Sequence, residues 1–566
     1  MIHDFIKKFI VCLIIILATL QGLLSQDFTP SYFAGGNKLL WVFVKPRLKN
    51  NLQAVTYSTK TKERLVKNGW TFDRSDYKLP GEIIDSVARV VDSIRVCSRL
   101  LRAISVEANY EQYLQLKTGS YVKRVEPVAI FKKEPDTLTG IQESFLAKNG
   151  QYGNSFTQLD QIGIPDLHAA GLTGKGVRIA LLDAGFDKRH EVFQKILKEN
   201  RLVATRDFVF NDNIVYNQNQ WDIDNNQESH GTSVWSLIAA YNPGTMIGGA
   251  YNAEFVLAKT EKTGSETRIE EDNYIAGVEW ADSLGADIIS ASLGYRDFEN
   301  FEYSYSELDG HTARTSKAIN WAARRGILCV VSAGNDHYRF SDGGIVSPAD
   351  SPEALTVGAV DSMGVIAGFS SRGPTADGRI KPDLCAMGVY NFVANSWSNT
   401  TYSIGNGTSY STPILASGCA LLLENFSKWT PDTLIAELKK YATLSNNPDT
   451  AYGWGIPDLL MTYEKNQTLP EPPESTPENQ ILCTPNPVSN MARFYYHDAD
   501  KIARNDGQLN VYNVLGQKIY TKRIKNYVPK WNLKDESGSR VPSGIYIIRI
   551  QSDDEKDKVG KMSIIF

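Results

Sequence analysis

Between residues 151 and 463, short apolar runs alternate with amphipathic segments, and this alternation constrains the fold more than any other feature of the chain. The runs at 177–182 and 327–331 are almost continuously apolar, which is typical of strands in a parallel sheet covered on both faces. The segments at 270–283 and 315–325 have the length and periodicity of helices. Alternating strands and helices predict an α/β domain with a parallel sheet and helices on both of its faces.

The region before this domain, residues 26–150, is mixed in composition and fairly charged. Residues 39–44 and 121–131 have the composition of strands, whereas 83–104 has helical periodicity. We therefore expect a smaller α+β unit in front of the α/β domain.

The chain after residue 463 changes character twice. Residues 464–482 are rich in proline and glutamate, which predicts an extended, semi-rigid linker. Residues 483–566 carry short alternating runs, such as 509–514 and 545–550, separated by glycine and asparagine turns. This pattern predicts a small β-sandwich.

Residues 1–25 have the pattern of a secretory signal peptide. Lys7 and Lys8 precede an apolar run from Phe9 to Ala18, and Ser25 offers a small residue for cleavage. A membrane anchor would need about 20 apolar residues, roughly twice this run, and no later segment is apolar enough to span a bilayer. We expect an exported protein without a stable membrane span.

Charge and cysteine content disfavour two classes of function. The net charge of −4 gives no basic field for nucleic acid, so we expect no nucleic-acid partner. The six cysteines are widely spaced and include no Cys-x-x-Cys pair. The sequence therefore predicts neither a disulfide framework nor a zinc site built from cysteines.

Three chemically capable residues follow apolar runs or begin apolar helices: Asp183, His230 and Ser409. Each alone is as well explained by a turn or a helix cap. Together they form a possible catalytic set, because a serine hydroxyl needs a base, and the base works best when a carboxylate fixes its tautomer. The carboxyl ends of parallel strands are also where functional groups gather in α/β sheets.

A fourth residue, Asn335, ends the stretch Ser332-Ala333-Gly334-Asn335 after the apolar run 327–331. An oxyanion formed during acyl transfer needs preorganised donors, and a side-chain amide at a strand end supplies one. The backbone N–H of Ser409 at the start of its predicted helix would supply the second.

These motifs, in this order along the chain, resemble those of the subtilisin-like serine peptidases: Asp183-Ala184-Gly185, His230-Gly231-Thr232, Ser332-Ala333-Gly334-Asn335 and Gly407-Thr408-Ser409 with Pro413. The resemblance implies that Ser409 is the nucleophile, His230 the base, Asp183 the orienting acid and Asn335 the oxyanion donor. It also implies that two segments line the substrate: Ser292, Leu293 and Gly294, and Ala333 and Gly334. One residue departs from the family, since Ala184 stands where most members carry Ser or Thr; we expect it to tune activity rather than abolish it.

The two flanking regions resemble parts of exported peptidases. Residues 26–150 are generally similar to propeptides of this family. The end of the chain resembles the C-terminal sorting domain of type IX secretion substrates, in Pro485-Asn486-Pro487, in 511–517, in 542–546 and in Gly560-Lys561-Met562. The resemblance implies a proprotein exported through the periplasm to the surface or medium of a Gram-negative bacterium, with the type IX secretion machinery and protein or peptide substrates as partners.

Metal and cofactor sites are weakly indicated. Asp222, Asp224, Asn226 and Glu228 alternate before His230, and oxygen ligands at alternate positions can bind calcium, but the EF-hand spacing is missing. We expect a solvated acidic loop, with a structural calcium as the alternative. We expect no cofactor and no metal in catalysis.

Two other functions and one specificity question stay open. The chain could be a catalytically silent surface-binding protein on the same fold. An esterase of the α/β-hydrolase type is disfavoured by the order of the three residues and by the absence of Gly-x-Ser-x-Gly. Asp336 and Asp342 either attract a basic substrate side chain or are solvated loop charges, and the sequence does not decide between these.

Overall fold

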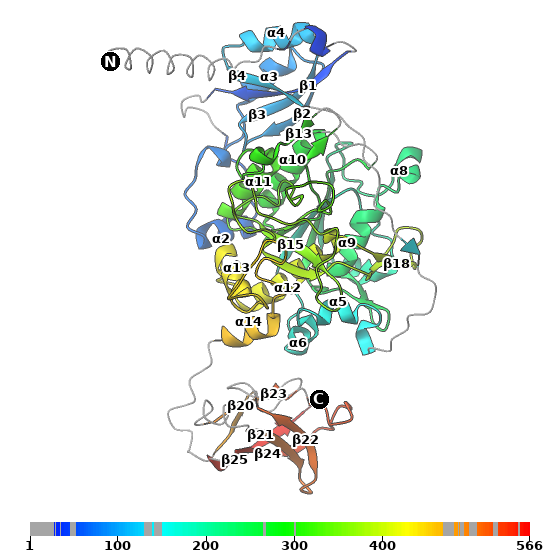
Figure 1. Ribbon diagram of the computed structural model, residues 1–566, viewed down its shortest axis with the longest axis vertical. Helices are drawn as coiled ribbons and strands as arrows, with labels where there is room; N and C mark the ends of the chain where they lie inside the picture. Colours follow the sequence, from blue (N-terminus) through cyan, green and yellow to red (C-terminus); the bar gives the residue numbers. More distant parts are fainter. Residues whose placement is uncertain are drawn as a thin grey trace, which may run out of the picture.

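The computed structural model describes residues 28, 30–33, 36–45, 53–128, 139–140, 150–263, 268–298 and 301–467, and then 480–484, 486, 492–496, 507–524, 530–531, 533–552 and 555–565. The predicted signal peptide, residues 468–479 of the predicted linker, and Pro485 and Pro487 lie outside the described residues. Within those ranges, no helix is long and apolar enough to cross a membrane. Figure 1 shows an N-terminal sheet, a central α/β body and a C-terminal group of strands.

A seven-stranded sheet with strand order β16-β15-β14-β11-β6-β10-β7 forms the centre of the molecule. Every neighbouring pair in it is parallel, as predicted. The strands are β6 (Arg178–Asp183), β7 (Leu202–Asp207), β10 (Glu254–Lys259), β11 (Ile288–Ala291), β14 (Leu328–Ser332), β15 (Leu355–Val360) and β16 (Leu384–Met387).

Helices cover both faces of this sheet, which explains why inner strands such as β6 and β14 are almost continuously apolar. Because side chains alternate along a strand, Ile179 and Leu181 of β6 pack into one apolar cluster, with residues of α9 (Ser229–Ala239) and α12 (Thr408–Asn425). Ala180 and Leu182 pack into the other, with α10 (Arg268–Leu284) and α11 (Arg314–Arg324). The remaining helices of the body are α5 (Phe156–Asp160), α6 (Ile164–Ala169), α7 (Gln194–Lys198), α8 (Gln220–Asp224), α13 (Pro431–Lys440) and α14 (Leu459–Lys465).

The N-terminal region is an α+β unit, as predicted. Its four strands pair antiparallel in the order β2-β3-β1-β4. One face of the sheet packs with α3 and α4, and the other packs toward α10 through Trp41 and Phe43. The elements are β1 (Lys38–Val44), α2 (Thr59–Lys67), α3 (Gly81–Ala88), β2 (Ser93–Ser98), β3 (Ala103–Ala108), α4 (Tyr110–Thr118) and β4 (Val122–Val128).

The helix predicted over 83–104 is wrong beyond Ala88. There α3 ends, a turn follows, and the chain continues as β2 and the start of β3. The apolar residues Val87, Val91 and Ile94 are spaced as in a helix, but Ile94 and Val96 also alternate as in a strand. Pairing of β2 with β3 decides between the two patterns, and that pairing depends on tertiary contacts.

The C-terminal strands form two antiparallel sheets, in the orders β19-β20-β23 and β22-β21-β24-β25, around one shared apolar core. This agrees with the predicted β-sandwich. The strands are β19 (Leu482–Thr484), β20 (Ala492–Tyr495), β21 (Gln508–Asn513), β22 (Lys518–Arg523), β23 (Lys530–Trp531), β24 (Gly544–Ser552) and β25 (Glu555–Ile564).

A small antiparallel sheet contains the two strands that directly precede α12 in the chain. Strand β17 (Asn391–Ala394) pairs with β18 (Tyr402–Gly405), and β18 also pairs with β5 (Thr139–Gly140), which lies near the C-terminal end of the N-terminal region. Two short hairpins complete the body: β8 (Tyr241–Asn242) with β9 (Met246–Ile247), and β12 (Asp297–Phe298) with β13 (Phe301–Glu302).

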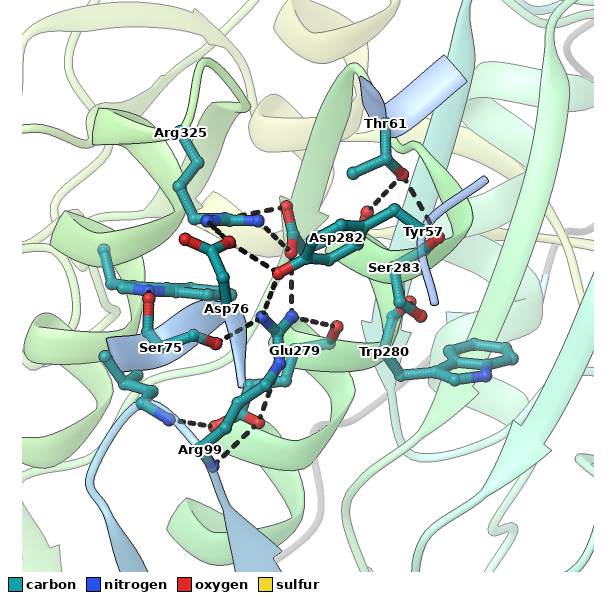
Figure 2. Close-up of polar contacts among 12 residues, drawn as sticks. Tyr57, Thr61, Ser75, Asp76, Arg99, Glu279, Trp280, Asp282, Ser283 and Arg325 are labelled. Carbon is teal, nitrogen blue, oxygen red and sulfur yellow. Dashed lines mark hydrogen bonds and ion pairs between the residues drawn. The ribbon is translucent and has the colours of Figure 1, made fainter. Parts of the chain in front are cut away.

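A buried ionic cluster joins the N-terminal region to α10 and to the end of α11 (Figure 2). Asp282 of α10 accepts hydrogen bonds from Arg64 at 2.7 Å and from Arg99 at 2.8 Å, both in the N-terminal region. Arg325, which follows α11, donates to Asp282 and reaches back to Asp76 at 2.7 Å. Burial acts to raise the pKa of Asp282, but the three guanidinium groups outweigh it and hold that pKa below its usual range.

Candidate active site

Asp183 is the last residue of β6, between β10 and β11 at the carboxyl edge of the sheet, and its side chain is fully buried. One carboxylate oxygen, Oδ1, accepts the backbone N–H of Ala184 at 2.7 Å and Nδ1–H of His230 at 2.8 Å. Within the described residues, the other oxygen, Oδ2, has no hydrogen-bond partner. Ala184, the next residue, brings no hydroxyl to it.

His230 is the second residue of α9, and the glycine after it lets this helix approach β6 closely. A Cβ on Gly231 would lie 2.2 Å from the carbonyl oxygen of Gly185 and 3.0 Å from Oδ1 of Asp183. Any larger residue would therefore push the helix away from the acid. The imidazole of His230 is partly exposed, and its ring lies edge-on to that of Tyr410, with the ring centres 6.2 Å apart.

Ser409 is the second residue of α12, one position before Tyr410, and its Oγ lies 3.4 Å from the carbonyl oxygen of Ser292. Pro413 is the sixth residue of this helix and so lies beyond its first turn. A proline has no N–H, and in a helix that N–H would bond to the carbonyl of Ser409. The hydroxyl of Ser292 donates to this carbonyl at 2.8 Å instead, which ties the start of α12 to the end of β11.

Asn335 follows β14, and its amide oxygen accepts the backbone N–H of Thr408 at 2.9 Å and the hydroxyl of Thr408 at 3.0 Å. These two bonds fix the amide beside the start of α12. Since the oxygen end is engaged, the NH₂ end of the exposed Asn335 side chain is the one left to donate. Thr408 is thus an orienting residue that the sequence analysis missed, although its place in Gly407-Thr408-Ser409 signalled it.

The two predicted substrate-lining segments lie side by side. Ser292, Leu293 and Gly294 follow β11, whereas Ala333 and Gly334 follow β14, and these strands are parallel neighbours. The structure therefore brings every predicted site residue to one edge of the sheet or to the two helix starts that face it.

The acidic loop before His230 is only partly solvated, which corrects the expectation of a solvated loop. Asp224 and Asn226 are exposed, but Asp222 and Glu228 are buried. The buried ammonium of Lys259 lies 3.0 Å from Oδ2 of Asp207 and 3.7 Å from Oδ2 of Asp222, so the protein itself supplies positive charge here. In the part of the chain that the structure describes, no three His, Cys, Asp or Glu side chains are grouped to hold a metal ion.

Comparison with known proteins assigns the two main parts of the chain. Residues 174–455 match the model of the subtilase family, and residues 484–565 match that of a secretion system C-terminal sorting domain. Subtilisin E of Bacillus subtilis (strain 168) is 30% identical over 351 residues, which are 61% of this chain and 80% of that protein. The subtilisin of Bacillus pumilus is 30% identical over 302 residues, and Subtilisin Savinase of Lederbergia lenta is 29% identical over 299; each match spans 53% of this chain and 94% of the relative.

The chain therefore belongs to the subtilase family of serine peptidases. It is a serine endopeptidase that carries a secretion sorting domain at its C-terminus.

Proposed function

We propose that this endopeptidase uses Ser409 as nucleophile, His230 as general base and Asp183 as the orienting carboxylate. The proposal rests above all on the 2.8 Å hydrogen bond between Nδ1 of His230 and the buried Asp183. This bond keeps the proton on Nδ1, so that Nε2 is the nitrogen that accepts the Ser409 proton. Asp183 then stabilises the imidazolium that forms.

Attack of Ser409 Oγ on the peptide carbonyl places a negative charge on the substrate oxygen. We assign its stabilisation to the amide NH₂ of Asn335 and to the backbone N–H of Ser409 near the start of α12. Thr408 supports this role, because its two hydrogen bonds hold the amide oxygen away from the oxyanion. Collapse of the intermediate expels the amine, which takes its proton from His230, and water then hydrolyses the acyl-enzyme by the same steps in reverse. The route needs no metal ion and no organic cofactor.

We further propose that residues 26–150 are an inhibitory propeptide. The buried cluster around Asp282 holds this region on the body, and β5 pairs with β18, only a few residues before Ser409 in the chain. A tethered segment beside the site blocks it at a high effective concentration. Release requires a cut, which we place near residue 150 and assign to the enzyme itself. Tyr152 and Gly153 are buried, so a cut there must precede Tyr152; Lys148 and Asn149 lie outside the described residues.

For export, we propose a route through the periplasm, after removal of residues 1–25, to the surface or medium of a Gram-negative bacterium. The match of the C-terminal strands to a secretion sorting domain supports type IX secretion as the final step.

The test of the catalytic and propeptide assignments is Ser409→Ala in the full-length chain. We expect this variant to fold, to hydrolyse no peptide and to accumulate as an unprocessed precursor in a host without other peptidases. Ser417→Ala is the matched control, since Ser417 is a buried serine of the same helix that donates to the carbonyl of Ile414. A Ser409→Ala chain that matured at the normal position would contradict self-processing, and a wild-type protein without any turnover would favour the silent binding protein.

A further inference from the structure

Two glycines face each other across the space between the predicted substrate-lining segments, and one side chain reaches both of them. A Cβ on Gly294 would lie 2.5 Å from Cγ2 of Val346, and a Cβ on Gly334 would lie 3.2 Å from the same methyl group. Val346 is almost fully buried, with 4% of its surface exposed. A single valine methyl therefore lies against both of the predicted substrate-lining segments.

Val346 is held firmly in this position. Tyr295 and Ser347, the residues after Gly294 and Val346, exchange two backbone hydrogen bonds of 2.7 and 3.1 Å. Ile345, on the other side of Val346, belongs to the same apolar cluster as Leu293. Because valine is branched at Cβ, its rotamers are also restricted. The methyl group cannot turn away from the pocket without disturbing these contacts.

The two carboxylates that could have attracted a basic substrate side chain both have an arginine partner. Asp342 binds Arg296 through two hydrogen bonds of 2.8 and 2.6 Å, and these bonds hold the pKa of Asp342 below its usual range. Asp336 lies 3.8 Å from the guanidinium of Arg339. Arg339 also pairs with Asp297, so the charge of Asp336 is compensated only in part. Asp342 offers no uncompensated charge to a lysine or arginine of the substrate.

From these contacts we propose that Val346 closes the floor of the pocket for the residue before the cut bond, so that the enzyme cleaves after small side chains such as alanine. The inference rests on the proposed function, since it assumes that peptides bind between Gly294 and Gly334 for attack by Ser409. Aromatic and long basic side chains are excluded by the methyl group, and Asp342, paired with Arg296, does not attract a basic one. A misfit of one methylene in such a pocket changes kcat/KM by about 10–200-fold.

The experiment compares short peptide substrates that differ only in the residue before the cut bond: alanine, phenylalanine or lysine. With the matured wild-type enzyme we expect kcat/KM for alanine to exceed that for the other two by at least about 10-fold. Val346→Gly removes the methyl groups and should raise the ratio of phenylalanine to alanine cleavage by about 10–200-fold. Val346→Ala should give an intermediate ratio, and it replaces Val346→Gly in the test if the glycine variant does not fold.

The matched control is Val346→Thr, which keeps the branched shape and should leave the ratio within about threefold of the wild type, because side-chain size sets the discrimination. The inference is overturned if the wild type cleaves after phenylalanine as well as after alanine, or if neither Val346→Gly nor Val346→Ala changes the ratio. A wild-type enzyme that cleaves peptides and reacts with a fluorophosphonate at Ser409, yet shows no size preference, overturns this inference alone. A wild-type enzyme that neither reacts with the fluorophosphonate nor cleaves peptides overturns the proposed function as well as this inference.

Discussion

Arg99 of the N-terminal region forms buried ionic contacts with α10 of the body. Its Nη2 donates to Oδ2 of Asp282 at 2.8 Å and to the carbonyl of Glu279 at 3.2 Å, and its Nε lies 3.5 Å from Oε2 of Glu279. Arg99→Met keeps most of the side-chain volume but leaves two buried carboxylates short of one positive charge. Breaking a buried pair in this way costs about 3–5 kcal/mol, which corresponds to an association weaker by about 100- to 4,000-fold.

The assay is dilution of the matured enzyme with its cleaved N-terminal region still bound, followed by peptidase activity. The concentration at which half of the activity appears gives the apparent Kd of the region for the body. Lys60→Met is the control at the same interface. Lys60 pairs with Asp287 at 2.6 Å, but the two side chains are 24% and 26% exposed, so the loss should stay below about 1 kcal/mol, or roughly fivefold. The reasoning is refuted if Arg99→Met stays within fivefold of the wild type, or if Lys60→Met weakens binding as much.

Three further outcomes are expected. Asn335→Ala should leave KM nearly unchanged and lower kcat by about 10²–10³, the cost known for one oxyanion donor in subtilisin; full turnover would exclude Asn335 from that role. Buried Asp272, which accepts hydrogen bonds from Trp41 and Ser105, has its pKa raised by burial from 3.8 to about 6. The carboxyl of Asp272 therefore binds a proton more tightly in the folded state than in the unfolded state. Its protonated form stabilises the fold at low pH, and this stabilisation is lost as pH rises from about 4 to 6. In urea unfolding of a Ser409→Ala background, Asp272→Asn should therefore lessen the loss of stability between pH 4.5 and 7, by up to about 2 kcal/mol; an unchanged pH dependence would contradict this. Removal of 481–566 should leave an active body in the periplasm, as cell fractionation would detect, and normal delivery of the truncated chain to the medium would contradict the sorting role.

The sequence carries enough information for the central sheet and its edge, because strands buried on both faces must be apolar. Runs such as 327–331 are recognisable as strands for this reason. Polar residues directly after such runs are therefore candidates for the functional site. The position of Asn335 after β14 follows from this reasoning. Likewise, the helix that begins just before His230 is visible as a run of small and apolar residues.

Contacts between distant parts of the chain could not be predicted in the same way. The charged residues of 26–150 have the composition of a solvated surface, yet Arg64 and Arg99 are buried against Asp282, about 200 residues away. Likewise, Pro413 leaves one carbonyl without a helical partner, and only the fold shows that Ser292 supplies the donor. Such pairings depend on which surfaces meet, and local periodicity carries no record of that.

The most direct test of the catalytic assignment is to treat the matured wild-type enzyme with a fluorophosphonate and locate the adduct by peptide mass spectrometry. An activated serine displaces fluoride and keeps the phosphonate on its Oγ, whereas an ordinary serine does not react. The account predicts a single adduct on Ser409, formed much more slowly in His230→Ala and absent in Ser409→Ala. An adduct on another serine, undiminished labelling in His230→Ala, or peptide hydrolysis by a protein that is never labelled would contradict it.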